Sequence, residues 1–74
     1  MSSTLSPREA YWLVELTDRH FSLQDAMTNP EETDWSRIND AQAWLKETLY
    51  RASLELGDNE SNYLNDRAQR AAKR

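Results

Sequence analysis

Two stretches of this chain place residues at alternating steps of three and four, and the two series match each other layer by layer. The first series is Leu13, Leu16, His20, Leu23 and Met27, and the second is Trp35, Ile38, Gln42, Leu45, Leu49, Ala52 and Leu56. This spacing is typical of the contact side of two packed helices. If the helices fold back on each other, His20 and Gln42 fall in the same layer. The pattern predicts an antiparallel helical hairpin whose register is fixed by a polar layer of His20 and Gln42.

The first helix is predicted at about residues 7–28. Ser6 is a suitable N-cap, Pro7 suits the first helical position, and Glu9 stands three residues after the cap. Together they form a capping box, which is a strong signal for a helix start. A second cap-like stretch begins near Ser22, so the sequence leaves open whether this helix is broken there.

The second helix is predicted at about residues 35–56, after a turn that contains Pro30. It should end at Gly57, the only glycine of the chain, because glycine readily takes the left-handed conformation that follows many helices. Asp58 and Asn59 are then expected to cap a short, partly frayed third helix at about residues 60–70, whose first half docks. The predicted fold is all-α.

The length of 74 residues allows one domain, which we expect to span residues 1–74 with flexible ends at 1–5 and 71–74. A core of this size is marginal unless a partner chain adds to it. The chain has no cysteine and therefore no disulfide or zinc–thiolate site. No secretory signal or apolar run of membrane-spanning length is recognised, and we expect a cytoplasmic protein.

Charge is distributed unevenly along the chain. Residues 1–66 carry 13 acidic and five basic side chains, whereas the last eight residues carry four basic side chains and no acidic one. The acidic body disfavours duplex binding through the helices. The candidate nucleic-acid contact is therefore confined to the tail, at Arg67, Arg70, Lys73 and Arg74, where the alternative is a solubilising role.

The predicted hairpin leaves more apolar surface than it can cover. In the first helix, Tyr11, Val14 and Phe21 lie almost opposite the contact series, and in the second, Trp44 does so while Tyr50 and Leu54 flank it. A lone small domain forgoes stability if such side chains stay in water. We expect these residues to form a dimer or partner interface: Tyr11, Val14, Phe21, Trp44, Tyr50 and Leu54. A homodimer is the favoured form, ahead of a complex with a different protein.

The sequence contains no constellation of reactive groups. His20 is the only histidine, and it has no second metal ligand, no nucleophile at a defensible spacing and no glycine-rich loop beside it. We therefore expect no enzyme activity, catalytic residue, cofactor or metal, and assign His20 a structural role.

The function expected from these features is that of a non-enzymatic, protein-binding regulator or inhibitor that uses aromatic anchors on a dimeric scaffold. In size and composition the chain is similar to the accessory proteins that bacteriophages and mobile elements encode to bind host or cognate proteins. Two alternatives remain open: a nucleic-acid-associated regulator that uses the basic tail, and an antitoxin-like subunit that folds on its partner.

Overall fold

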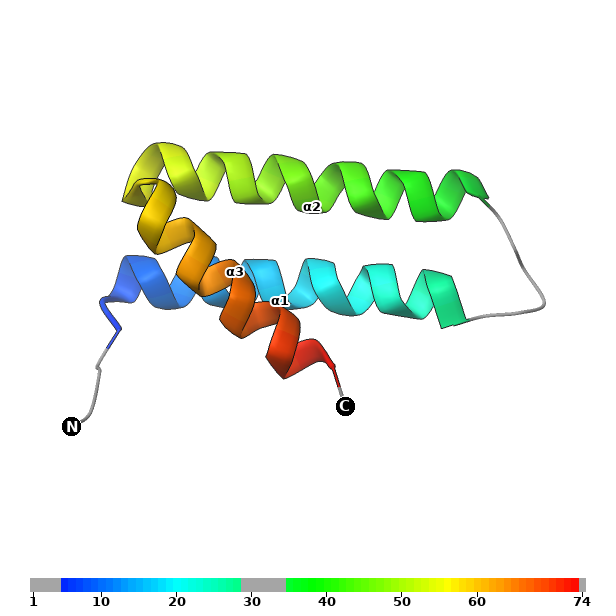
Figure 1. Cartoon of the computed structure of the whole chain (residues 1–74), viewed down its shortest axis with the longest axis horizontal. Helices are drawn as coiled ribbons and strands as arrows, with labels where there is room; N and C mark the ends of the chain where they lie inside the picture. The colour runs from blue at the N-terminus through cyan, green and yellow to red at the C-terminus, as the bar shows by residue number, and fades with distance from the viewer. Residues whose placement is uncertain (1–4, 29–34, 74) are drawn as a thin grey trace.

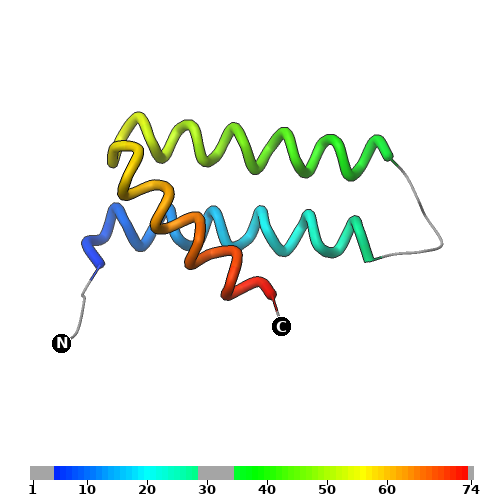
Figure 2. Tube along the Cα trace, in the orientation of Figure 1, coloured from blue at the N-terminus to red at the C-terminus, as the bar shows by residue number. Residues whose placement is uncertain are grey.

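The computed structural model describes residues 5–28 and 35–73, and every regular element in these ranges is a helix. The elements are α1 (Pro7–Thr28), α2 (Trp35–Leu56) and α3 (Asp58–Ala72). Figure 1 shows α1 and α2 side by side, with α3 crossing α1 at an angle, and the same path is visible in the backbone trace of Figure 2. The all-α prediction and the bounds of both long helices are confirmed, and α1 runs through Ser22 without a break.

The start of α1 has the hydrogen bonds of a capping box. The backbone N–H of Ser6 donates to Glu9 Oε1 at 2.9 Å, and the backbone N–H of Glu9 donates to Ser6 Oγ at 3.2 Å. Two amide groups that have no partner within the helix are satisfied in this way. The prediction of this helix start is confirmed.

Gly57 joins α2 to α3 without an intervening loop. Its φ is +94° and its ψ is 160°, a backbone conformation that is essentially confined to glycine. Its N–H donates to the carbonyl of Ser53 at 2.9 Å, and its own carbonyl accepts the N–H of Ser61 at 3.0 Å. The predicted break at Gly57 is confirmed, although its ψ places it outside the left-handed helical region.

The third helix begins earlier and ends later than the predicted range of 60–70. Gly57 is the N-cap and makes no side-chain cap hydrogen bond, so the predicted capping by Asp58 or Asn59 is wrong. The helix continues to Ala72, which is almost fully buried. Burial of small side chains along α3 explains its length, because tertiary packing supports turns that would otherwise fray.

The core lies where α3 meets the other two helices. Leu16 of α1 and Leu64 and Ala68 of α3 are completely buried and form one cluster. Half-buried side chains pack against this cluster from α1, from α2 and from the residue before Ser6: Leu5, Trp12, Leu13, Leu45, Leu49 and Leu56. The third helix therefore supplies central core residues along its whole length, and does not dock only by its first half.

The predicted polar layer of His20 and Gln42 is wrong. His20 is buried, and its Nε2 lies 2.8 Å from Oδ1 of Asn65 in α3, within hydrogen-bond distance, while Gln42 is exposed. The cause is that α2 turns Ala41, Leu45, Thr48 and Ala52 inward in place of Gln42. Heptad spacing describes a contact between two helices only. In this structure, α1 and α2 both also pack against α3.

The far end of the predicted contact series is also open. Met27 and Trp35, which were expected to form a packed layer, are both largely exposed.

The predicted turn at Pro30 lies outside the described residues, as do residues 1–4 and Arg74. Leu5 packs against the core, and flexibility of the chain ends stays a prediction. None of the described helices combines the length and hydropathy of a membrane span.

A pair of carboxyl groups joins the first turns of α1 and α3. The interaction between the Glu9 and Glu60 carboxyl groups lowers the pKa of Glu9 and raises the pKa of Glu60. The pKa of Glu9 is lowered further by its hydrogen bonds with Ser6. Two carboxyl groups can share a hydrogen bond only while one of them is protonated, and they repel each other when both are ionised.

The first prediction concerns the core. Leu64→Ala should lower the free energy of unfolding by about 2–5 kcal/mol, because it removes a completely buried side chain and leaves a cavity. The control Leu54→Ala removes a side chain that is 69% exposed and should change stability by no more than about 0.5 kcal/mol. Urea titration followed by circular dichroism measures both, and equal losses would contradict the assigned core.

The second prediction concerns pH. A raised pKa of Glu60 in the folded state stabilises the fold below the ordinary glutamate pKa, and this stability is lost as pH rises through the raised value. Glu60→Gln supplies a permanent N–H donor to Glu9, so its melting temperature should exceed that of the wild type at pH 7. The difference should shrink as pH falls towards about 4.5. Glu47→Gln, which removes a partner of Arg51, is the control and should show no such gain.

Candidate functional site

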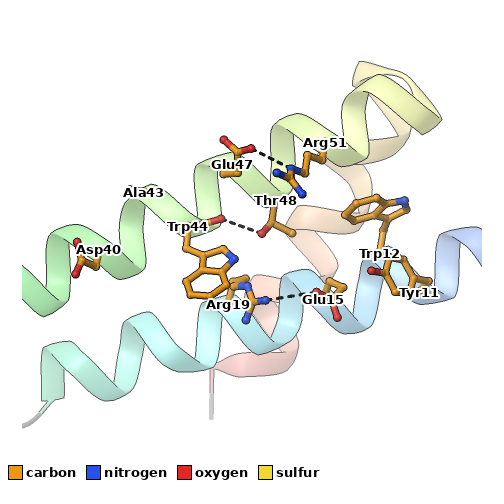
Figure 3. A pocket seen from close by; sticks show the side chains of 10 residues that line it. All are labelled: Tyr11, Trp12, Glu15, Arg19, Asp40, Ala43, Trp44, Glu47, Thr48 and Arg51. Atoms are coloured by element: carbon orange, nitrogen blue, oxygen red, sulfur yellow. Dashed lines mark hydrogen bonds and ion pairs between the residues drawn. The ribbon is translucent and has the colours of Figure 1, made fainter.

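An open groove of about 800 Å³ runs between α1 and α2. No residue of α3 lines it, so it lies on a side of the α1–α2 pair that α3 leaves uncovered (Figure 3). Its walls are aromatic and charged, and they are formed by Tyr11, Trp12, Glu15, Arg19, Asp40, Ala43, Trp44, Glu47, Thr48 and Arg51. The groove is larger than a second hollow of about 270 Å³ beside α3, and it is therefore taken as the candidate binding site.

The groove exists because short side chains lie between large ones. Thr48 is buried, and its Oγ1 donates to the carbonyl of Trp44 at 2.9 Å, which keeps the side chain close to its own helix. In Figure 3, Trp44 reaches from the middle of α2 towards α1, and Trp12 lies on α1 at the right of the view. Both indoles line the groove, and so does the short side chain of Thr48.

Trp44 is held in place by Arg19. The guanidinium carbon of Arg19 lies 4.4 Å from the centroid of the Trp44 ring, which is a cation–π contact. Arg19 is itself fixed by Asp18 at 3.0 Å and by Glu15 at 3.5 Å, while its buried Nε has no hydrogen-bond partner. Trp44 nevertheless remains 59% exposed. Its indole is thus positioned by the fold and still available to a ligand.

Trp12 is held in place by Glu55. The indole Nε1–H of Trp12 donates to Glu55 Oε2 at 3.1 Å, and Arg8 forms an ion pair with the same carboxylate. The hydrogen bond from Arg8, followed by that from Trp12, lowers the pKa of Glu55. Tyr11 packs against Trp12 edge to face, with ring centroids 5.0 Å apart. The second indole is therefore also held by a contact with the other long helix.

The charges that line the groove are unequally satisfied. Arg51 pairs with Glu47 at 2.9 Å, and Arg19 is engaged by Glu15 and Asp18. Asp40 is exposed and has no ion-pair or hydrogen-bond partner for its carboxylate among the described residues. The arginines are thus neutralised within the chain, while one carboxylate on the wall is left to interact with a ligand.

The six residues predicted to form an interface are all exposed, and two of them line the groove. Tyr11 and Trp44 line the groove, and Tyr50 lines a smaller hollow beside α3. Val14, Phe21 and Leu54 line neither. The exposure of these six side chains was therefore predicted, and the structure places two of them in the groove.

Sequence reasoning did not identify the side chains that hold the anchors. These side chains are Arg19 for Trp44 and Glu55 for Trp12. A helical-wheel comparison of α1 and α2 would have placed Arg19 and Trp44 on facing sides only if the rotation of α2 were known.

The basic tail is not a free cationic cluster. Arg70 pairs with Asp66 at 2.8 Å, and the guanidinium carbon of Arg67 lies 5.9 Å from the ring centroid of Tyr63. Lys73 is exposed at the end of α3, and Arg74 lies outside the described residues. Two of the four residues proposed for nucleic-acid contact thus have partners within the chain.

His20 has a structural environment. It is buried in α1 and bonded to Asn65, and it lies outside the groove. Among the described residues, no group of three or more histidine, cysteine, aspartate or glutamate side chains is arranged to hold a metal ion.

The sequence matches no protein-family model, no curated protein and no solved structure. The groove and its residues are therefore interpreted from their geometry and chemistry alone.

Proposed function

We propose that this chain is a non-enzymatic binding protein that takes a segment of another protein into the groove between α1 and α2, and regulates or inhibits that protein by occupying it. The observation that carries the proposal is the pair of indoles, Trp12 and Trp44, which are held by polar contacts at the groove and remain accessible. Tryptophan, tyrosine and arginine side chains dominate the binding energy of protein interfaces.

Fixed anchors favour tight binding because less conformational entropy is lost when a partner docks. Arg19 restrains Trp44, and Glu55 restrains Trp12, before any partner arrives. An indole that served only the stability of the fold would be expected to be buried, whereas more than half of Trp44 is exposed. These features support a docking role for the groove.

In this proposal α1 and α2 form the antiparallel hairpin on which the groove is built. Arg8 in the first turn of α1 pairs with Glu55 in the last turn of α2, and Arg19 in the middle of α1 contacts Trp44 in the middle of α2. These contacts support opposite chain directions. Both anchors are thereby fixed by contacts between the two long helices.

We further propose that the scaffold is a homodimer that associates through a different surface of α1. Val14 and Phe21 are 65% and 43% exposed, lie outside the groove and are seven residues apart, which puts them on one side of the helix. Two-fold self-association is the commonest way for small chains to cover such surface. A separate dimer contact leaves both grooves open to a partner.

We also propose that the chain is a cytoplasmic accessory protein of the kind encoded by phages or mobile elements, since such proteins act by binding other proteins. The support is indirect: a short, acidic, cysteine-free helical chain with exposed aromatic anchors.

The third prediction tests the groove. When the full chain is used as bait, Trp44→Ala should lose partner proteins that the wild type retains, because it removes the exposed indole of the groove. The matched control is Trp35→Ala, which removes an exposed indole outside the groove and should retain them. Quantitative mass spectrometry of the captured proteins provides the comparison. Equal retention by all three baits, or equal loss in both variants, rules out docking in the groove.

The fourth prediction tests the dimer. Sedimentation velocity should give a dimer for the wild type and a monomer for the double variant Val14→Glu, Phe21→Glu, because two charges would be buried in the contact. Trp44→Ala should remain dimeric. A monomeric wild type, or a dimer that survives the double substitution with its helical signal intact, excludes this surface.

A further inference from the structure

We infer that the segment bound in the groove is an amphipathic helix that carries lysine or arginine beside its apolar stripe. This inference rests on the proposed function and specifies the chemistry of its partner. It combines three observations: the pairing of α1 with α2, the aromatic side chains of the groove, and the state of the charges around it.

A helix is favoured because the α1–α2 pair already binds one. On one side of the pair, α3 inserts Leu64, Ala68 and Ala72, all of which are almost completely buried. The groove lies on a side of the same pair to which α3 contributes no residue. Two helices packed side by side present similar hollows on their two sides, so a further helix laid in the groove would complete a four-helix arrangement.

An apolar stripe is favoured by the groove wall. Trp12 and Trp44 flank a space whose lining includes the short side chain of Thr48. A leucine, methionine or phenylalanine side chain inserted there would bury its own surface and that of both indoles. Burial of one such side chain contributes roughly 1.5–3 kcal/mol.

Basic residues are favoured by the charges that remain. Around the groove, the guanidinium groups of Arg19 and Arg51 are engaged by carboxylates of the same chain. Asp40 on the α2 wall has no such partner among the described residues. A cationic side chain next to the apolar stripe would pair with Asp40, whereas an acidic one would be repelled by it.

The occupant is assigned to a different protein and not to a second copy of this chain. The cationic helix that a second copy could offer is α3, whose apolar side is already buried in its own core. Its Arg70 pairs with Asp66, and its Arg67 stacks on Tyr63. A second copy would therefore have to release internal contacts before docking.

The experiment is a selection of displayed helical peptides against the full-length chain. A library with randomised surface positions on a helical framework is selected on the wild type, and binders retained by Trp44→Ala are discarded. The recovered peptides should be enriched in lysine and arginine over aspartate and glutamate. Selection on Asp40→Lys should reverse this preference. Asp25→Lys makes the same charge change at an exposed position outside the groove and should leave the preference unchanged.

Binding of individual peptides supplies the magnitude. Replacing the lysine of a selected peptide by glutamate should weaken binding to the wild type by about tenfold or more, as measured by tryptophan fluorescence. Raising the salt concentration should reduce this difference, because exposed charges are screened. Circular dichroism of each variant confirms that the chain remains helical.

The outcomes separate the inference from the proposed function. Peptides that depend on Trp44 but show no preference for basic residues, or the same preference on Asp40→Lys, overturn the inference and leave the proposed function standing. Failure to recover any peptide that depends on Trp44 counts against both. A wild-type oligomer that Trp44→Ala dissociates assigns the groove to a second copy and also overturns the inference.

Discussion

The packing of α3 onto α1 is the contact on which the rest of this structure depends. Leu64 and Ala68 are buried against Leu16, and no other group of described residues forms a comparable cluster. Gly57 makes this possible, because its positive φ lets α3 start directly after α2 and turn back over the other helices. The hydrogen-bonding pair of His20 and Asn65 then joins α1 to α3 within the same contact. Because α3 provides much of the core, α1 and α2 do not have to pack against each other along their full length. Met27, near the end of α1, and Trp35, at the start of α2, remain exposed.

The same packing explains why a groove remains. A pair of helices can be covered on two sides, and the chain has only one further helix among its described residues with which to cover them. The side of the α1–α2 pair that α3 does not cover carries large aromatic side chains, and these are held by contacts with charged residues. Arg19 stacks on Trp44, and Glu55 accepts a hydrogen bond from Trp12, so charged groups that would ordinarily be solvated restrain two indoles. Polar contacts therefore position the indoles of the groove, and exposed ion pairs of this kind contribute little to stability.

Some of these features could be read from neighbouring residues. The capping box of Ser6 and Glu9, the lengths of the first two helices and the break at Gly57 are local properties, and each was predicted. The exposure of Tyr11, Val14, Phe21 and Trp44 was predicted as well, because a single partner helix cannot cover opposite sides of another helix. By contrast, the partner of His20 could not be inferred from a two-helix pattern, since Asn65 lies 45 positions away on a helix whose packing the pattern does not describe.

The sequence by itself determined that this chain is helical, where its two long helices begin and end, and that more aromatic surface is present than a hairpin can bury. Only the tertiary structure decided how α2 is rotated, how far α3 extends, and which exposed side chains lie together in the groove. The physical reason is that capping and helical periodicity act within a few turns. The rotation of a helix about its axis, in contrast, is fixed by the combined packing of all its neighbours, here including Leu64 and Ala68 of a helix with few large apolar residues.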